Sequence, residues 1–183
     1  MTGMEDGSRY EGKMEETIIM INKLHMAMIE LYHGDAKRIQ HFCKVHSYAK
    51  LIAEMENVDA ATLFILETAA LTHDIGIHLC EEKYGNSNGK LQEKEGPAIA
   101  QKLLAELGFS EAVSERVQYL IAHHHTYQNI DGIDYQILVE ADFLVNMYED
   151  GLSEEAIQNA YRNIFRTEAG KKICQEMYEL RGV

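Results

Sequence analysis

The stretch Leu66-Glu-Thr-Ala-Ala-Leu-Thr-His-Asp-Ile-Gly-Ile-His78 decides the fold, because it places a histidine and an aspartate at the end of an apolar run. The residues before His73 are small and apolar at helical spacing, which predicts a buried helix that Gly76 ends. An imidazole and a carboxylate at the inner end of a buried helix carry a large desolvation cost unless each is paired or bound to a metal ion. A metal ion is therefore the first candidate partner of His73 and Asp74.

The composition favours one helical domain. The chain has 183 residues, 46% of them hydrophobic, which is enough for one well-packed core, and it has a single proline, Pro97. The formal net charge of −13 argues against a nucleic acid or an anionic membrane as the main partner. We expect no membrane-spanning segment and no signal peptide. The three cysteines form no paired motif, so we expect reduced thiols and a cytoplasmic protein.

Apolar spacing and capping residues predict helices along most of the chain. We expect a flexible extension over residues 1–14 and a single domain over residues 15–183. After a first helix from Glu15, the predicted helix starts are Asp35, Asp59, Gln92 with Pro97 in the first turn, Ser110, Asp134, Ser153 and Thr167. The turn-forming residues around Tyr84–Lys90 predict a loop. The fold class is thus all-α, a bundle of about seven or eight helices.

One acidic residue lies where the pattern predicts the core. Asp142 follows Leu138 by four residues and precedes Val145 by three, which places it on an apolar helix face. A carboxylate on such a face is uncommon unless its charge is compensated. Asp142 is therefore a candidate metal ligand.

Histidines add further candidates. His41 shares a helix row with core residues, and His46 is the competing candidate in the same helix. Three successive histidines, His123 to His125, end another predicted helix. Consecutive helical residues point about 100° apart, so at most two of the three can face one ion. We expect His123 to point outward.

Together these residues resemble a known family. Thr72-His73-Asp74-Ile75-Gly76 looks like the signature of the HD superfamily of metal-dependent phosphohydrolases, in which a His, a His-Asp pair and a distant Asp lie on helices. His41 precedes a Val by four residues and an Ala by eight, as in the opening pattern of the family, so the resemblance favours His41 over His46. Ile121 followed by two histidines resembles the double-His stretch of dinuclear members. The resemblance covers about residues 35–149 and implies an HD-domain-like helical fold.

The resemblance also implies a ligand set. It assigns His41, His73, Asp74 and Asp142 to one divalent ion, and it lets Asp74 bridge to a second ion held by His124 and His125. Mixed imidazole and carboxylate ligands suit a divalent transition metal, namely Mn, Fe, Co, Ni or Zn, bound as one or two ions.

The sequence departs from the family at two places. A common form has a lysine directly after His-Asp-Ile-Gly, where this chain has Ile77. Three residues are candidates for the missing positive charge: His78, Lys83 and Lys90. Many dinuclear members carry another histidine near the start of the helix that contains Pro97, and this chain has none there. The candidates for that place are Gln92, Glu93 and Glu95.

The implied function is hydrolysis of a phosphate ester or anhydride in a small phosphorylated substrate such as a nucleotide, by metal-activated water. Asp74 would hold or deprotonate the water, and His78 is the candidate acid for the leaving group, with His123 as an alternative. Two other interpretations stay open. One is a catalytically degenerate HD module that binds a nucleotide and regulates. The other is an unrelated helical bundle whose histidines are incidental.

Overall fold

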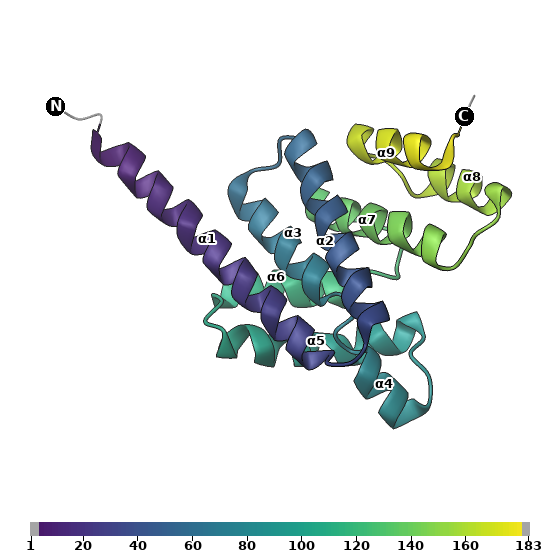
Figure 1. The fold of residues 1–183 in the computed structure, drawn as a ribbon, viewed down its shortest axis with the longest axis horizontal. Helices are drawn as coiled ribbons and strands as arrows, with labels where there is room; N and C mark the ends of the chain where they lie inside the picture. Colours follow the sequence, from purple (N-terminus) through teal and green to yellow (C-terminus); the bar gives the residue numbers. More distant parts are fainter. Residues whose placement is uncertain (1–3, 181–183) are drawn as a thin grey trace.

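The computed structural model describes residues 4–180, which form nine helices and no strand (Figure 1). The helices are α1 (Met4–Leu31), α2 (Ala36–Met55), α3 (Ala60–Thr72), α4 (Ile77–Tyr84), α5 (Gly89–Glu106), α6 (Glu111–Ile121), α7 (Ile133–Glu149), α8 (Glu154–Asn163) and α9 (Glu168–Tyr178). The predicted all-α bundle is confirmed.

Helix α3 lies at the centre of the bundle, where it packs against α1, α2, α6 and α7 (Figure 1). Every residue from Leu66 to Thr72 is buried. Ala69 and Ala70 have short side chains, so neighbouring helices approach α3 closely. Helix α2 packs on both α3 and α7. Because of this packing, His73, the residue directly after α3, lies in the interior of the protein.

Most predicted helix starts are correct, because the predicted capping side chains make the expected hydrogen bonds. In each case the side-chain oxygen accepts a hydrogen bond from a backbone N–H of the first turn. This holds for Asp35, Asp59, Ser110, Ser153 and Thr167.

The region after Gly76 differs from the prediction. Helix α4 occupies residues 77–84, so the predicted loop shrinks to residues 85–88 and a ninth helix is added to the expected seven or eight. Helix α5 begins at Gly89 because the side chain of Asn88 accepts a hydrogen bond from the N–H of Leu91 at 3.2 Å. Pro97 therefore lies inside the helix and not in its first turn.

The start of α7 also differs. Gly132 is the residue before the helix, and Asp134, the predicted cap, lies in the first turn. There its Oδ1 forms an ion pair with Nη2 of Arg116 at 2.7 Å. The carboxylate thus ties α7 to α6.

A close backbone contact joins the end of α3 to α5. A Cβ atom on Gly76 would lie 3.0 Å from the backbone N and 3.1 Å from the Cα of Gly96. Side chains at both positions would force the two segments apart. The glycines therefore let α5 lie directly against the turn that contains His73 and Asp74.

Helix α1 includes residues 4–14, which the sequence assigns to a flexible extension, and its first half projects beyond the other helices (Figure 1). Residues 1–3 lie outside the described residues. The boundary between residues 14 and 15 stays a prediction.

One stretch meets the length and composition of a membrane span, which the sequence did not lead us to expect. It covers Ala60–Tyr84, and 67% of its apolar window is buried inside the protein. A turn over residues 73–76 also separates α3 from α4 within it. These features fit a core segment, which passes the same test of length and composition.

A buried carboxylate anchors the C-terminal helices. Glu140 is fully buried on α7, and its Oε1 accepts hydrogen bonds from the backbone N–H groups of Arg166, at 2.6 Å, and Thr167, at 2.9 Å. Its Oε2 accepts a hydrogen bond from the Thr167 hydroxyl at 2.5 Å. Glu140 thus fixes the segment that starts α9.

We expect Glu140→Ala to lower the free energy of unfolding by about 3 kcal/mol, because it leaves several buried donors without an acceptor. Urea denaturation measures the loss. Glu140→Gln keeps one acceptor oxygen and should cost clearly less. Equal losses in the two variants would contradict this role.

Candidate metal centre

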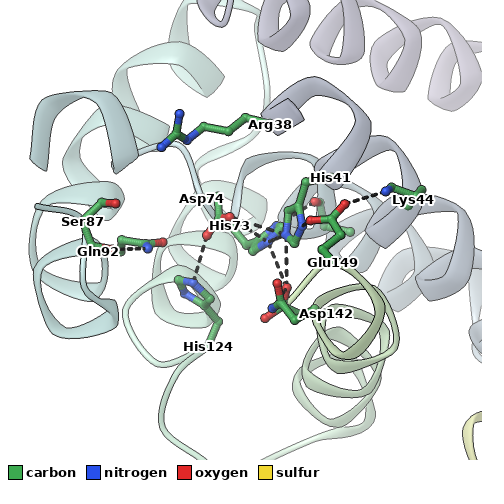
Figure 2. Close-up of polar contacts among 12 residues, drawn as sticks. Arg38, His41, Lys44, His73, Asp74, Ser87, Gln92, His124, Asp142 and Glu149 are labelled. Atoms are coloured by element: carbon green, nitrogen blue, oxygen red, sulfur yellow. Dashed lines mark hydrogen bonds and ion pairs between the residues drawn. The ribbon is translucent and has the colours of Figure 1, made fainter. Parts of the chain in front are cut away.

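The structure brings the six predicted metal ligands together in two adjoining groups. Figure 2 labels all of them except His125. The first group is His41, His73 and Asp142, and the second is Asp74, His124 and His125. Within each group the possible ligand atoms lie within 4.8 Å of one another. The residues come from α2, from the turns that follow α3 and α6, and from α7.

In the first group, the ring nitrogens of two histidines and a carboxylate oxygen lie close together. Nε2 of His41 lies 3.2 Å from Nε2 of His73 and 3.2 Å from Oδ1 of Asp142. The Nδ1–H of His73 donates to the carbonyl oxygen of Ala70 at 2.9 Å, and the Nδ1–H of His41 donates to Oε2 of Glu149 at 2.9 Å. Both Nε2 atoms face the Asp142 carboxylate and share protons with it when no ion is bound, and a cation can take the place of those protons.

The second group contains nitrogens that lack a partner. The Nδ1–H of His124 donates to the carbonyl oxygen of Ile121 at 2.7 Å, so its Nε2 carries a lone pair. Nε2 of His124 and Nε2 of His125 are buried and have no hydrogen-bond partner within residues 4–180. Burial and the nearby His124 lower the pKa of His125 to about 4, so this ring is neutral at pH 7. Buried imidazole nitrogens without a hydrogen-bond partner fit a divalent transition metal.

Asp74 lies between the two groups. Its Oδ2 is 3.5 Å from Nε2 of His41 and 3.5 Å from Nε2 of His73, and its Oδ1 is 3.5 Å from Nε2 of His124. One carboxylate oxygen thus faces each group. The hydroxyl of Tyr32, a fully buried residue, donates to the backbone oxygen of Asp74 at 2.7 Å and fixes the turn. No sequence signal pointed to Tyr32.

The electrostatics of the centre favour positive charge. Burial opposes charging of His73, but the carboxylates of Asp74 and Asp142 outweigh it and raise the pKa of His73 to about 9. Burial likewise opposes ionisation of Asp74, yet the nearby His73 lowers its pKa. The pKa of Asp142 is lowered by hydrogen bonds to His41 and His73, which outweigh burial. Both carboxylates are therefore anionic at neutral pH.

Glu149 orients His41 from behind. It accepts from Nδ1 of His41, and its other oxygen pairs with Nζ of Lys44 at 2.5 Å (Figure 2). Such a carboxylate fixes the tautomer and direction of a metal-binding imidazole. The sequence reasoning missed Glu149, although it follows Asp142 by seven residues, two helical turns on the same face of α7.

Glu93 and Glu95 are candidates for the missing histidine, and neither belongs to the two groups. Oε1 of Glu93 accepts from the backbone N–H of His125 at 3.1 Å and from the Thr126 hydroxyl at 2.9 Å. Glu95 accepts from the hydroxyl of Tyr84 at 2.5 Å. Glu93 thus holds the turn that carries His125. The third candidate, Gln92, is buried, and its Nε2 donates to the backbone oxygen of Ser87 at 2.7 Å.

Other predicted residues lie outside the two groups. Nε2 of His78 pairs with Oδ2 of Asp35 at 3.1 Å, so the structure does not bring His78 to the centre, and its catalytic role stays a prediction. His46 pairs with Glu67 at 2.9 Å. His123 donates to the carbonyl oxygen of Tyr119 at 2.7 Å.

A pocket of about 350 Å³ opens onto the centre. Its lining includes the candidate ligands His41, Asp74, His125 and Asp142. Lys37 and Arg38 line it from the start of α2, Ser87 lines it from the connection between α4 and α5, and Gln92 lines it from the first turn of α5. The pocket can therefore admit a small polar molecule to the predicted metal ligands.

We expect Glu149→Ala to weaken metal binding roughly tenfold to a hundredfold, because His41 loses the group that orients its ring. Competition with a chelator measures the affinity. Lys44→Met is the matched control, since it removes the neighbouring charge and leaves the Glu149–His41 contact. Loss of a positive charge alone would strengthen cation binding, so a weakening in Lys44→Met as large as in Glu149→Ala would contradict a role carried by the Glu149–His41 contact alone.

Comparisons with known proteins identify the fold and the family of the chain. No curated protein matches the chain. The crystal structure of a predicted HD superfamily hydrolase from an uncultured Thermotogales bacterium has a TM-score of 0.62 and 25% sequence identity, over 86% of this chain and 84% of that one.

Two structures of Bacillus subtilis YpgQ share the fold. The first has a TM-score of 0.60 at 17% identity over 89% of this chain and 90% of that one. The selenomethionine form has a TM-score of 0.63 at 17% identity over 89% and 88%. The HD domain profile matches residues 38–167 of the sequence. Because this match extends over more than half of the chain, the protein belongs to the HD domain family.

Proposed function

We propose that the protein is a metal-dependent phosphohydrolase that cleaves a phosphate ester or anhydride of a small phosphorylated metabolite, with nucleotides as the favoured substrate class. The observation that carries the proposal is the pair of ligand groups that share Asp74 at the base of a pocket. Separate structural ion pairs would not leave buried imidazole nitrogens without partners.

The proposed ligands divide as the two groups do. His41, His73 and Asp142 hold one divalent ion together with Asp74, which also contributes to a second ion held by His124 and His125. A divalent ion at this place supplies Lewis-acid charge to a phosphoryl oxygen and lowers the pKa of bound water.

Asp74 is the residue best placed to orient the attacking water. It lines the pocket, and its carboxylate is ionised, so it accepts a hydrogen bond from a water molecule and directs the oxygen toward the phosphorus. The Tyr32 contact holds the backbone of Asp74 in place. Orientation of the water by a fixed carboxylate raises the rate because less freedom is lost on the way to the transition state.

Lys37 and Arg38 are the proposed source of positive charge for the phosphate. Lys83 and Lys90, two sequence candidates, form ion pairs with Glu95 and Glu93 and do not line the pocket. Lys37 lines the pocket and has no ion-pair partner among residues 4–180. The Arg38 guanidinium also lines the pocket, although it pairs with two carboxylates. Basic residues here compensate for the absence of a lysine at position 77.

Part of the lining suits the rest of a nucleotide. Asn146 and Asp150 line the pocket from the end of α7, and Ser87 lines it from the α4–α5 connection. Their side chains offer donors and acceptors for hydroxyl and amino groups. This polar lining supports a nucleotide more than an apolar phosphate ester.

The first test is the metal content of anaerobically purified wild type, Asp74→Ala and Asp150→Ala, measured by elemental analysis. We expect transition metal in the wild type, its loss in Asp74→Ala, and its retention in Asp150→Ala, which changes a pocket acid outside both groups. A screen for phosphate release from nucleotides then follows. No metal after reconstitution with Mn²⁺, Fe²⁺ and Zn²⁺ would overturn the proposal. Metal and nucleotide binding without hydrolysis would instead establish a degenerate binding module.

With a hydrolysed nucleotide in hand, we expect Lys37→Ala to raise KM about tenfold, because the phosphate loses a charged partner. Lys83→Ala removes a lysine paired outside the pocket and should leave KM unchanged. Steady-state kinetics at two salt concentrations separate a local contact from the general field of the protein. An equal rise in KM for both variants would contradict a specific role for Lys37.

A further inference from the structure

Three buried side-chain atoms have no hydrogen-bond partner within residues 4–180: Oε1 of Gln92, Nε2 of His124 and Nε2 of His125. Buried polar atoms are almost always paired, so each unpaired atom points to a missing partner. Two of the three belong to the second ligand group. The third, Gln92, lines the same pocket as Asp74 and His125.

The orientation of the Gln92 amide follows from its other contact. Its Nε2 donates to the backbone oxygen of Ser87 at 2.7 Å. A flipped amide would set two oxygens against each other, so the nitrogen belongs on the Ser87 side. In Figure 2 the Gln92 side chain extends toward Asp74 and His124, with its nitrogen held by Ser87. Its oxygen is therefore a directed acceptor.

The backbone around Gln92 is held firmly at this place. The close approach of Gly76 and Gly96 sets α5 against the turn that contains Asp74. Glu93, the residue directly after Gln92, accepts from the N–H of His125. Gln92 is itself only 7% exposed. A side chain fixed in this way is suited to bind an ion, because little freedom is lost on binding.

We propose that Oε1 of Gln92 is a ligand of the second metal ion, together with Asp74, His124 and His125. The inference rests on the metal centre proposed above. Oε1 of Gln92, Nε2 of His124 and Oδ1 of Asp74 are all acceptors, because the donor positions of Gln92 and His124 are used elsewhere. One water molecule has two hydrogens and cannot satisfy three acceptors, whereas one cation can.

An amide oxygen as ligand would affect the affinity and the metal preference of the second site. It is neutral and hard, so it binds a transition metal less tightly than an imidazole does and narrows the advantage of Zn²⁺ over Mn²⁺. Each ion would have two imidazoles and would share Asp74, but the first would have the buried carboxylate of Asp142 where the second would have the neutral amide of Gln92. The second ion should therefore be the weaker of the two, and it should exchange more readily.

The test is a titration of the metal-free protein with Mn²⁺. Calorimetry measures the affinities, and electron paramagnetic resonance measures the concentration of free Mn²⁺ at each step. For the wild type we expect two ions with unequal affinities. Gln92→Ala should weaken only the second ion, by about tenfold or more. Gln92→Glu has the same length and an anionic oxygen, so it should bind the second ion more tightly than the wild type. Thermal melting of each metal-free variant shows that it is folded.

Gln118→Ala is the matched control, because the Gln118 amide bonds only to Ser114 in its own helix. It should leave both affinities unchanged. Two unaltered affinities in Gln92→Ala would overturn the inference and leave the metal centre intact, and a higher KM in that variant would assign Gln92 to the substrate. Absence of any bound ion in the wild type would instead sink the proposed function.

Discussion

The structure depends on one cluster of buried carboxylate and imidazole groups in the core, whose negative charges and lone pairs need partners. Asp142 and the fully buried His73 meet there with His41, and Asp74 adds a second carboxylate. Taking such groups out of water is costly, and the cost is recovered only if charge and lone pairs find partners. Contacts farther out serve this purpose. Tyr32 holds the backbone of Asp74, Glu149 orients His41, and Glu93 holds the turn at His125.

Helix ends give the centre a second electrostatic advantage. His73 and Asp74 follow the last residue of α3, and His124 and His125 follow the last turn of α6. The C-terminal end of a helix carries partial negative charge on its free carbonyl groups, which attracts a cation. His73 and His124 make the same hydrogen bond: each ring donates to the backbone carbonyl oxygen three residues earlier. The carbonyl groups that a helix leaves unpaired therefore set the direction of the imidazole rings.

The sequence predicted those parts of the fold that depend on local chemistry. Apolar spacing identified the helices, and cap residues such as Asp59 and Ser110 located their starts. Asp142 stood out because a carboxylate on an apolar stripe demands an explanation. Short helices were harder, since α4 has eight residues and lies beside turn formers. The pairing of Asp134 with Arg116 was also out of reach, because it depends on how α6 and α7 pack.

The supporting residues of the centre were the least predictable. Tyr32 and Glu149 act through contacts between segments far apart in the chain, 42 residues from Asp74 and 108 from His41. The spacing of apolar residues in the sequence predicts which face of a helix is buried, but it does not predict which other segment packs against that face. Lys37 was missed for the same reason, because its place in the pocket follows from the position of α2 relative to α5 and α7. Motif resemblance suggested the candidate ligands, and the tertiary structure shows which residues surround them.

The ligands of the centre come from α2, α7 and the turns after α3 and α6, so they span most of the domain. An ion held by His41 and Asp142 acts as a cross-link between distant parts of the chain, with the effect on chain entropy that a long-range disulfide has. Its binding free energy adds to the free energy of unfolding, since the unfolded chain cannot assemble the same ligands. Metal supply would then set the lifetime of the folded protein as well as its chemistry. A cell short of the metal would hold a less stable protein, with a larger unfolded fraction open to proteolysis.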